Sequence, residues 1–242
     1  MAMVHGLPSS GEALVVCAVP ESISPELARA RYLALLSETE RKQHDRFRFD
    51  DDRHTYLVAH ALVRTTLGGM LGVAPEVLTF AIGEHGKPEL TYAEHPDVRF
   101  NLSHTRGLVA CGVTRSDDIG IDVEQIDRRL EIDHLAGSVL SEDEQAALVP
   151  LAGSARRERF FRHWTLKEAY VKAIGRGIAL PLRSLHVEIA PAQAPQLVFR
   201  PPFEDDAGAW WLASETLHGS HVLGVVVRRS APLRLAIERI EL

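Results

Sequence analysis

The chain has 242 residues, of which 45% are hydrophobic and 25% charged, a composition that supports one large or two small globular domains and does not indicate disorder. Its 27 Lys and Arg against 33 Asp and Glu give a formal net charge of -6, which argues against a nucleic-acid binder and against a protein of anionic membrane surfaces. Two cysteines, Cys17 and Cys111, are too few and too isolated for a disulfide framework or a zinc site, so a reducing, cytoplasmic setting fits best.

The first predicted element is a buried strand at residues 13–19. This run is apolar, has no basic flank before it and ends at Pro20, which is not the pattern of a signal peptide. No stretch of the sequence approaches the length of a membrane span. Ser-x-x-Glu spacing at Ser37 and again at Ser141 predicts two helix starts. Further strands are predicted at residues 77–82, 98–102, 108–114, 119–124, 185–189, 210–215 and 222–228. We therefore expect an α+β fold.

A faint internal repeat joins the two parts of the chain. Tyr56, followed by Ala-Leu-Val-Arg at residues 61–64, recurs 108 residues later as Trp164, followed by Ala-Tyr-Val-Lys at residues 169–172. Chance similarity between two amphipathic helices is the alternative explanation. Because both stretches lead through glycines into strands, we expect two similar α+β halves, residues 1–115 and 116–242, related by a pseudo-twofold axis with the ligand between them.

Two carboxylates stand on one face of the strand predicted at residues 119–124. Side chains alternate along a strand, so Asp122 and Glu124 emerge on the same side. Their mutual repulsion is relieved by a cation between them, and Mg²⁺ is the natural one because it prefers oxygen ligands. The alternative is the solvated polar face of an edge strand.

The helix predicted around residues 160–174 carries one acidic and one basic residue that can pair. Glu168 and Lys172 are four residues apart and therefore lie on one helix face. The pair is either an ordinary surface salt bridge or a metal ligand followed by an ammonium, and the second combination suits a metal-bound pyrophosphate.

Polar residues that are each only a weak indication of a binding site lie earlier in the chain. Ser103 and His104 come at the end of a predicted strand, and Lys87 stands in a Gly-Lys-Pro turn. A solvent-facing lysine and a structural histidine are the ordinary interpretations of such residues.

Taken together and in this order, four motifs resemble those of the Sfp-type 4'-phosphopantetheinyl transferase family. They are a Gly-Lys-Pro turn at 86–88, an Asn-x-Ser-His strand end at 101–104, a Gly-x-Asp-x-Glu strand at 120–124 and a Lys-Glu-x-x-x-Lys helix at 167–172. The resemblance runs from about residue 37 to residue 181. The helix motif Trp-x-x-Lys-Glu-Ala at residues 164–169 is similar to that of the family branch that has Trp and Ala at these helix positions.

This resemblance implies an enzyme with the 4'-phosphopantetheinyl transferase fold. It implies transfer of the phosphopantetheine group of coenzyme A to a serine of an apo acyl or peptidyl carrier protein, with 3',5'-ADP as the second product. The enzyme would need Mg²⁺, for which Mn²⁺ is a substitute, and would work as a cytoplasmic monomer without nucleic-acid or membrane partners. It needs no nucleophile of its own, in agreement with the lack of a sequence motif for an activated Ser or Cys.

The resemblance also assigns roles to residues. Asp122, Glu124 and Glu168 would hold the metal on the pyrophosphate, and Lys172 would contact the same phosphates. The nucleotide, chiefly its 3'-phosphate, would be gripped by Lys87, Ser103 and His104.

Four further assignments each have a structural alternative. Lys167 would tie its helix to the acidic site or assist proton movement. Glu144 falls where some relatives carry a proposed general base, and a helix-capping carboxylate is the alternative. Arg46 and Arg53 would replace basic residues that some relatives direct at the 3'-phosphate, with a solvated helix face as the alternative.

Overall fold

A computed structural model describes residues 6–83, 85–128, 130–175 and 181–242 of the chain. These residues form two compact units. Of the described residues, unit 1 comprises those in the ranges 6–83, 88–116 and 234–242, and unit 2 comprises those in the ranges 85–87 and 117–233. Each unit combines helices with antiparallel strands, so the α+β prediction is confirmed.

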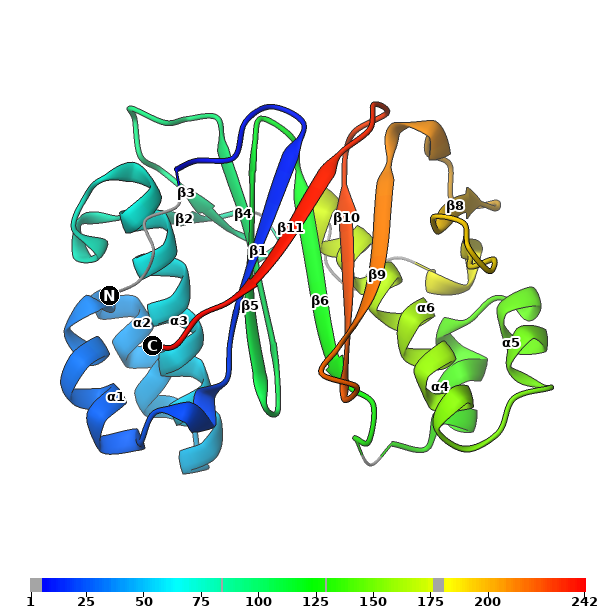
Figure 1. Cartoon of the computed structure of the whole chain (residues 1–242), viewed down its shortest axis with the longest axis horizontal. Coiled ribbons are helices and arrows are strands. Elements are labelled where there is room, and N and C mark those ends of the chain that lie inside the picture. Colours follow the sequence, from blue (N-terminus) through cyan, green and yellow to red (C-terminus); the bar gives the residue numbers. More distant parts are fainter. Residues whose placement is uncertain (1–5, 84, 129, 176–180) are drawn as a thin grey trace. The chain divides into compact units, whose positions relative to one another are not determined.

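Unit 1 is a four-stranded sheet with helices packed against it (Figure 1). The sheet has the order β11-β1-β5-β4, in which β1 pairs in parallel with β11 and antiparallel with β5. The apolar sides of β1, β4 and β5 form one core with the long helix α3. The elements are β1 (Glu12–Ala18), α1 (Pro25–Tyr32), α2 (Glu38–Arg46), α3 (Asp50–Leu71), β2 (Phe80–Ile82), β3 (Pro88–Leu90), β4 (Val98–Thr105), β5 (Leu108–Arg115) and β11 (Arg234–Arg239).

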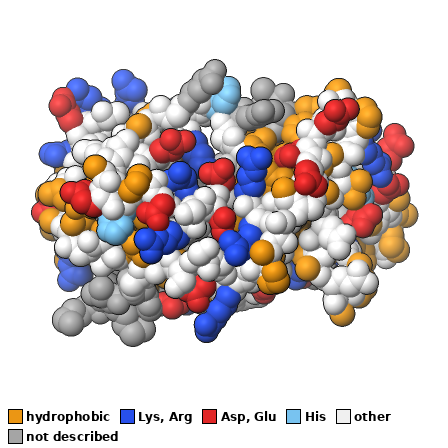
Figure 2. Space-filling model, turned by 90° about the horizontal axis from the view of Figure 1, so that it is seen from above, with side chains coloured by type: hydrophobic (Ala, Val, Ile, Leu, Met, Phe, Trp, Pro, Cys, Tyr) orange, Lys and Arg blue, Asp and Glu red, His pale blue; other side chains and the backbone are white. Residues whose placement is uncertain are grey.

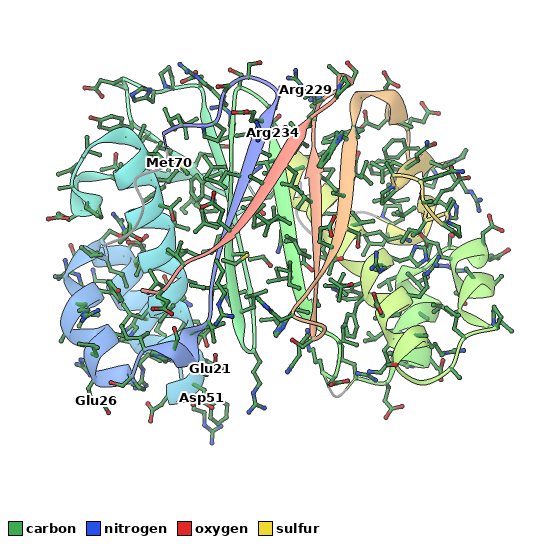
Figure 3. The ribbon with its side chains drawn as sticks, in the orientation of Figure 1. Glu21, Glu26, Asp51, Met70, Arg229 and Arg234 are labelled. Atoms are coloured by element: carbon green, nitrogen blue, oxygen red, sulfur yellow. The ribbon has the colours of Figure 1, made fainter. Side chains whose placement is uncertain are left out.

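Acidic side chains lie at the helix starts of unit 1. Glu26 is in the first turn of α1 and Asp51 is in the first turn of α3, both labelled in Figure 3. Carboxylates at these positions interact favourably with the unpaired amides and the positive end of the helix dipole. The start of α1 is further fixed by Ser24, whose hydroxyl accepts a hydrogen bond from the amide of Leu27.

Unit 2 is a three-stranded antiparallel sheet of order β6-β10-β9, crossed by the long helix α6. A second, two-stranded sheet is formed by β7 and β8. The elements are β6 (Ile119–Gln125), α4 (Ile132–Val139), α5 (Glu142–Leu148), α6 (Gly153–Ile174), β7 (Leu185–Glu188), β8 (Gln196–Phe199), β9 (Trp211–Leu217) and β10 (His221–Val227).

Two glycines allow α6 to approach this sheet. A Cβ atom on Gly120 would lie 1.9 Å from the carbonyl oxygen of Ala169, and a Cβ on Gly224 would lie 2.6 Å from that of Thr165. Neither distance is possible for real atoms, and the obstructing atoms belong to the helix backbone. The glycine of the Gly-x-Asp-x-Glu motif is therefore required by packing.

The two units repeat one order of elements. A first strand is followed by shorter helices, a 22-residue helix, a short hairpin and two further strands, and the last strand pairs with the first. The resulting pairings, β1-β5-β4 and β6-β10-β9, are the same, as a duplicated unit predicts.

The register of the repeat differs from the one predicted. The long helices end at Gly72 and Gly175, both in the left-handed conformation, and this separation of 103 residues replaces the predicted 108. The helices that begin after Ser37 and Ser141 are 104 residues apart and support the same register. The predicted match was therefore wrong by about five residues.

The ends of the two units also differ from the predicted halves at two places. Residues 234–242 were expected in the second half, but β11 pairs with β1 and so belongs to unit 1. Arg234, at the beginning of this strand, is labelled in Figure 3. Residues 84–87 were expected in the first half and belong to unit 2.

The surface carries charges of both signs. On the face drawn in Figure 2, acidic and basic side chains are interspersed, and hydrophobic ones are scattered among them. Within the described residues, no helix has the length and hydrophobicity needed to cross a bilayer.

Candidate active site

The acidic residues of β6 face the long helix of unit 2. Gly120, Asp122 and Glu124 alternate along the strand and therefore share one side of it. That side is the one on which α6 packs, because Gly120 lies directly under Ala169 and Ala173. Asp122 and Glu124 are both buried, so the alternative of a solvated polar face does not hold.

Each of the two β6 carboxylates has a basic partner. Lys172 Nζ of α6 donates to Asp122 Oδ1 at 2.6 Å, and Arg128 Nη1 donates to both oxygens of Glu124 at 2.7 and 2.9 Å. The sequence indicated that Lys172 would pair with Glu168 one turn earlier or serve the acidic site. The structure joins it to Asp122, across 50 residues of sequence.

Glu168 completes a group of three carboxylates. Burial raises the pKa of Glu168, the negative charges of Asp122 and Glu124 raise it further, and the ammonium of Lys172 opposes them. The charges of the three predicted metal ligands are therefore coupled. They come from two elements, β6 and α6, whose close contact depends on Gly120.

This donor set has the chemistry of a magnesium site, although its present geometry is that of ion pairs. Three carboxylates offer only hard oxygen ligands, and the ionised form of a partly buried Glu with a raised pKa is stabilised by a nearby cation. Among the described residues, however, no three His, Cys, Asp or Glu side chains are arranged to hold a metal ion. The cations beside Asp122 and Glu124 are the side chains of Lys172 and Arg128.

Lys167, adjacent to Glu168, belongs to a buried network on another side of α6. Its ammonium donates to Glu144 Oε2 at 2.5 Å, to the carbonyl oxygen of Val139 at 2.8 Å and to that of Leu182 at 2.9 Å. Burial lowers the pKa of Lys167, and the charge of Glu144 opposes this effect.

Glu144 caps the helix that it begins. Its carboxylate accepts from the amides of Ser141 and Val187, both at 2.7 Å, and the capping box predicted for Ser141 and Glu144 is present. The side chain is entirely enclosed. These contacts favour the capping role over the proton-accepting role that the sequence also allowed.

Lys87 contacts the segments that carry the acidic residues. Its ammonium donates to the carbonyl oxygens of Ile119, at the start of β6, and Ala173, in the last turn of α6, at 3.2 and 3.1 Å. The preceding Gly86 has φ +86°, which explains the glycine of the Gly-Lys-Pro turn. Lys87 thus belongs to unit 2 and lies beside the residue that follows Lys172.

The remaining predicted nucleotide contacts belong to unit 1. Ser103 is buried and His104 exposed on the last part of β4. Arg46 is exposed at the end of α2. Arg53 donates to Asp50 and to the carbonyl oxygen of Phe47, so it organises the start of α3. The assignment of these four residues to nucleotide binding stays a prediction.

Arg128 was missed by the sequence analysis. It lies just beyond β6, four residues after Glu124. The sequence gives no signal for this pair, because the i, i+4 rule holds for helices and Glu124 is in a strand.

Known proteins share this sequence over both units. Residues 118–226 match the 4'-phosphopantetheinyl transferase superfamily, and residues 24–114 match the family described as "4'-phosphopantetheinyl transferase, N-terminal". The 4'-phosphopantetheinyl transferase HetI of Nostoc sp. (strain PCC 7120) is 35% identical over 184 residues, 75% of each chain. A 4'-phosphopantetheinyl transferase of Bacillus subtilis is 32% identical over 159 residues, 66% of this chain and 69% of the relative. The 4'-phosphopantetheinyl transferase Sfp of Bacillus subtilis (strain 168) is 29% identical over 159 residues, with the same shares of both chains. The chain therefore belongs to the 4'-phosphopantetheinyl transferase family, as an Sfp-type member.

Proposed function

We infer that this chain is the transferase that moves 4'-phosphopantetheine from coenzyme A to a serine of an apo carrier protein, and that the acidic group of unit 2 carries the reaction. The family supports the activity. The observation that supports the location is the group Asp122, Glu124 and Glu168, held beside the ammonium of Lys172.

The reaction replaces the phosphoanhydride bond of coenzyme A with a phosphodiester bond to serine. The serine hydroxyl of the carrier protein attacks the β-phosphorus of coenzyme A, the bond from that phosphorus to the bridging oxygen of the pyrophosphate breaks, and 3',5'-ADP leaves. The serine proton must go to a base. The enzyme contributes positioning and charge, because the nucleophile belongs to the partner.

We propose that Asp122, Glu124 and Glu168 hold a Mg²⁺ ion, with Mn²⁺ as a substitute. The bound ion supplies positive charge to the pyrophosphate oxygens. Lys172 exchanges Asp122 for a phosphate oxygen when coenzyme A binds, and its charge stabilises the leaving group. Arg128 releases or shares Glu124 in the same way, and this makes Glu124 a weaker ligand than Asp122 and Glu168.

Lys87, Ser103, His104, Arg46 and Arg53 are proposed to bind the nucleotide, chiefly its 3'-phosphate. Support for Lys87 comes from its position at the last turn of α6, one residue beyond Lys172. We further propose a cytoplasmic, monomeric enzyme that serves acyl or peptidyl carrier proteins.

The test is mass spectrometry of an apo carrier protein after incubation with the chain, coenzyme A and Mg²⁺. We expect the carrier protein to gain a phosphopantetheine group with the wild type. Asp122→Asn and Glu168→Gln should each slow transfer by about 10²-fold or more, because each removes a negative charge from the proposed metal site.

Glu158→Gln is the matched control on the same helix. Glu158 pairs with Arg162 and Thr216 on the solvated part of α6 and should be dispensable. Mg²⁺ should raise the Tm of the wild type and of this control, but not of the Asp122 and Glu168 variants. Release of 3',5'-ADP without modification of any carrier protein would instead indicate a hydrolase.

A further inference from the structure

We propose that Glu144 and Lys167 are positioning residues, that they form the unit 2 copy of a clamp present in both units, and that Glu144 is not the proton acceptor of the reaction. The proposal rests on the function inferred above for its catalytic part. The clamp itself is a property of the fold and is tested separately.

The unit 1 clamp consists of Ser37, Glu40, His60 and Arg64. Ser37 and Glu40 form a capping box at the start of α2. Arg64 of α3 donates to Glu40 Oε2 from Nη2 at 2.7 Å and from Nε at 3.0 Å, and the ring of His60 lies 3.1 Å from Glu40 Oε1. Arg64 Nη1 also donates to the carbonyl oxygen of Leu78, beyond the end of the helix, at 3.0 Å. One buried cation thus joins two helices and the segment that follows them.

The unit 2 clamp repeats this arrangement with Ser141, Glu144, His163 and Lys167. Ser141 and Glu144 form the capping box of α5, and Lys167 of α6 donates to Glu144. Lys167 also donates to the carbonyl oxygen of Leu182, beyond the end of α6. The ring of His163 lies 3.6 Å from Glu144 Oε1, and burial together with the positive charge of Lys167 lowers the pKa of His163 to about 3.

The two clamps correspond residue by residue. In each, a histidine precedes the basic residue by four positions on the long helix, and the serine and glutamate open the preceding helix. The offset between the histidines, and between Arg64 and Lys167, is 103 residues, which is also the offset between the helix ends. The position and charge of the basic residue and its pairing with the capping glutamate are retained although arginine is replaced by lysine. The histidine contact is looser in unit 2, because His163 lies 3.6 Å from Glu144 and makes no hydrogen bond to it.

Unit 1 has the clamp without the acidic group. In β6, Asp122 pairs with Gly224, and in β1 the residue that pairs with the corresponding Gly112 is Val15. Glu124 corresponds in the same register to Cys17, and Glu168, which follows Lys167, corresponds to Thr65, which follows Arg64. Glu40 and Arg64 therefore persist where none of the three proposed metal ligands has a counterpart, so their role is structural.

In unit 2 the clamp also directs Glu168. Successive residues of a helix point about 100° apart, so fixing Lys167 fixes the direction of its neighbour. Lys167 is held by Val139 of α4, Glu144 of α5 and Leu182. These contacts set the rotation of α6 and so keep Glu168 turned toward β6.

The bonding of Glu144 argues against proton acceptance. Its carboxylate already accepts from the amides of Ser141 and Val187 and from Lys167, and it is fully enclosed. A base must come within hydrogen-bond reach of the hydroxyl that it deprotonates, and here a carrier-protein serine would have to displace these donors.

The experiment compares melting with transfer kinetics for matched variants of the two clamps. Glu144→Gln and Glu40→Gln each leave a buried cation without its carboxylate, and each should lower the Tm by roughly 10 °C. The double variant Glu144→Gln/Lys167→Met removes both charges and should melt higher than Glu144→Gln alone. If neither Glu144→Gln nor Glu40→Gln lowers the Tm, the proposed clamp is wrong.

The kinetic part separates positioning from proton transfer. Glu144→Gln should slow transfer by only about tenfold and keep the acid limb of the pH profile at its wild-type position. Lys167→Met should show a similar loss, whereas Lys167→Arg, which copies the unit 1 clamp, should restore kcat to within about threefold of wild type. Glu40→Gln should leave kcat at its wild-type value.

Loss of the acid limb in Glu144→Gln, with a rate decrease of about 10²-fold or more and an unchanged Tm, would identify Glu144 as the base and overturn the proposal. Equal losses in Lys167→Arg and Lys167→Met would overturn the positioning role. If the wild type transfers nothing to any carrier protein, the proposed function fails, while the melting comparison still decides whether the clamp exists.

Discussion

A carboxylate in the first turn of a shorter helix pairs with a basic side chain of the long helix in each unit, Glu40 with Arg64 and Glu144 with Lys167. Glu144 is buried and Glu40 partly buried. Burial alone would raise the pKa of Glu40, but hydrogen bonds from His60 and Arg64 outweigh it and hold the pKa at about 2. Since the unfolded chain has the ordinary value near 4.5, this carboxylate contributes stability at neutral pH.

The pH dependence of this contribution can be predicted. A carboxylate whose pKa is lowered by folding makes its full contribution to the free energy of unfolding above about pH 4.5. This contribution is lost as the pH falls toward about 2. Allowing for solvent screening, we expect Glu40→Gln to remove about 1–2 kcal/mol through this titration at pH 7. Urea unfolding of wild type and Glu40→Gln at pH 7, 5 and 3.5 should show the difference in unfolding free energy shrinking only at the lowest pH. A difference that grows in acid would contradict the assignment.

The contact between β6 and α6 is the element-scale feature on which the acidic group depends. It places Lys172 within 2.6 Å of Asp122, and it exists because Gly120 has no side chain. The sequence pattern predicted the shared face of Asp122 and Glu124 from strand alternation alone. It could not predict which helix residue would meet them, because that contact spans 50 residues of sequence.

Gly120→Ala tests this contact directly. The added Cβ would meet the backbone of Ala169 and Ala173, so α6 must move away from β6, at a cost of about 1–3 kcal/mol or more in unfolding free energy. Transfer should fall as well, because Lys172 and Glu168 move with the helix. Urea unfolding and the mass-spectrometric assay measure the two effects.

Gly137→Ala is the control for this substitution. Gly137 lies in α4 with no atom within 4 Å of its added Cβ, so alanine should be neutral or stabilise the helix by up to about 1 kcal/mol. Equal unfolding free energies for Gly120→Ala and Gly137→Ala would show that the close packing at Gly120 does not contribute to stability.

Element prediction from the sequence succeeded where apolar runs were bounded by turns. The strands at β1, β4, β5, β6, β7, β9 and β10 were all predicted to within a few residues. The short strands β3 and β8 and the terminal β11 were missed, because three to six residues give too little alternation. The repeat was placed five residues out of register because apolar residues recur every three or four positions in any amphipathic helix. The caps at Ser37, Ser141, Gly72 and Gly175 fix its position.

At the scale of the whole molecule, unit 1 is closed by the last strand of the chain. Residues of β11 pair with β1 from Glu12 to Cys17, and Ile240 and Leu242 pack against the unit 1 core. No local pattern in the sequence indicates this pairing, because its two strands are separated by almost the entire chain.

Removal of β11 should destabilise unit 1 in particular. We expect a chain ending at Leu233 to lose several kcal/mol of unfolding free energy and to aggregate through the uncovered edge of β1. Hydrogen exchange should show faster exchange in β1 and β5 than in β6 and β10. Arg234→Ala, which changes only an exposed side chain, should stay within about 0.5 kcal/mol of wild type. Uniform loss of protection in both sheets would contradict the assignment of β11 to unit 1.

The same strand constrains how the protein is made. The ribosome makes β1 before residues 117–233 and β11 after them, so unit 1 has all of its described strands only after unit 2 has been synthesised. Unit 2, which lies between residues 117 and 233 apart from the short segment ending at Lys87, is complete earlier. We therefore expect the N-terminal unit to finish folding second, against the usual N-to-C order of folding during synthesis. Until then, β1 is a nascent strand without one of its partners, and the period of exposure lengthens with every pause in translation downstream of residue 116.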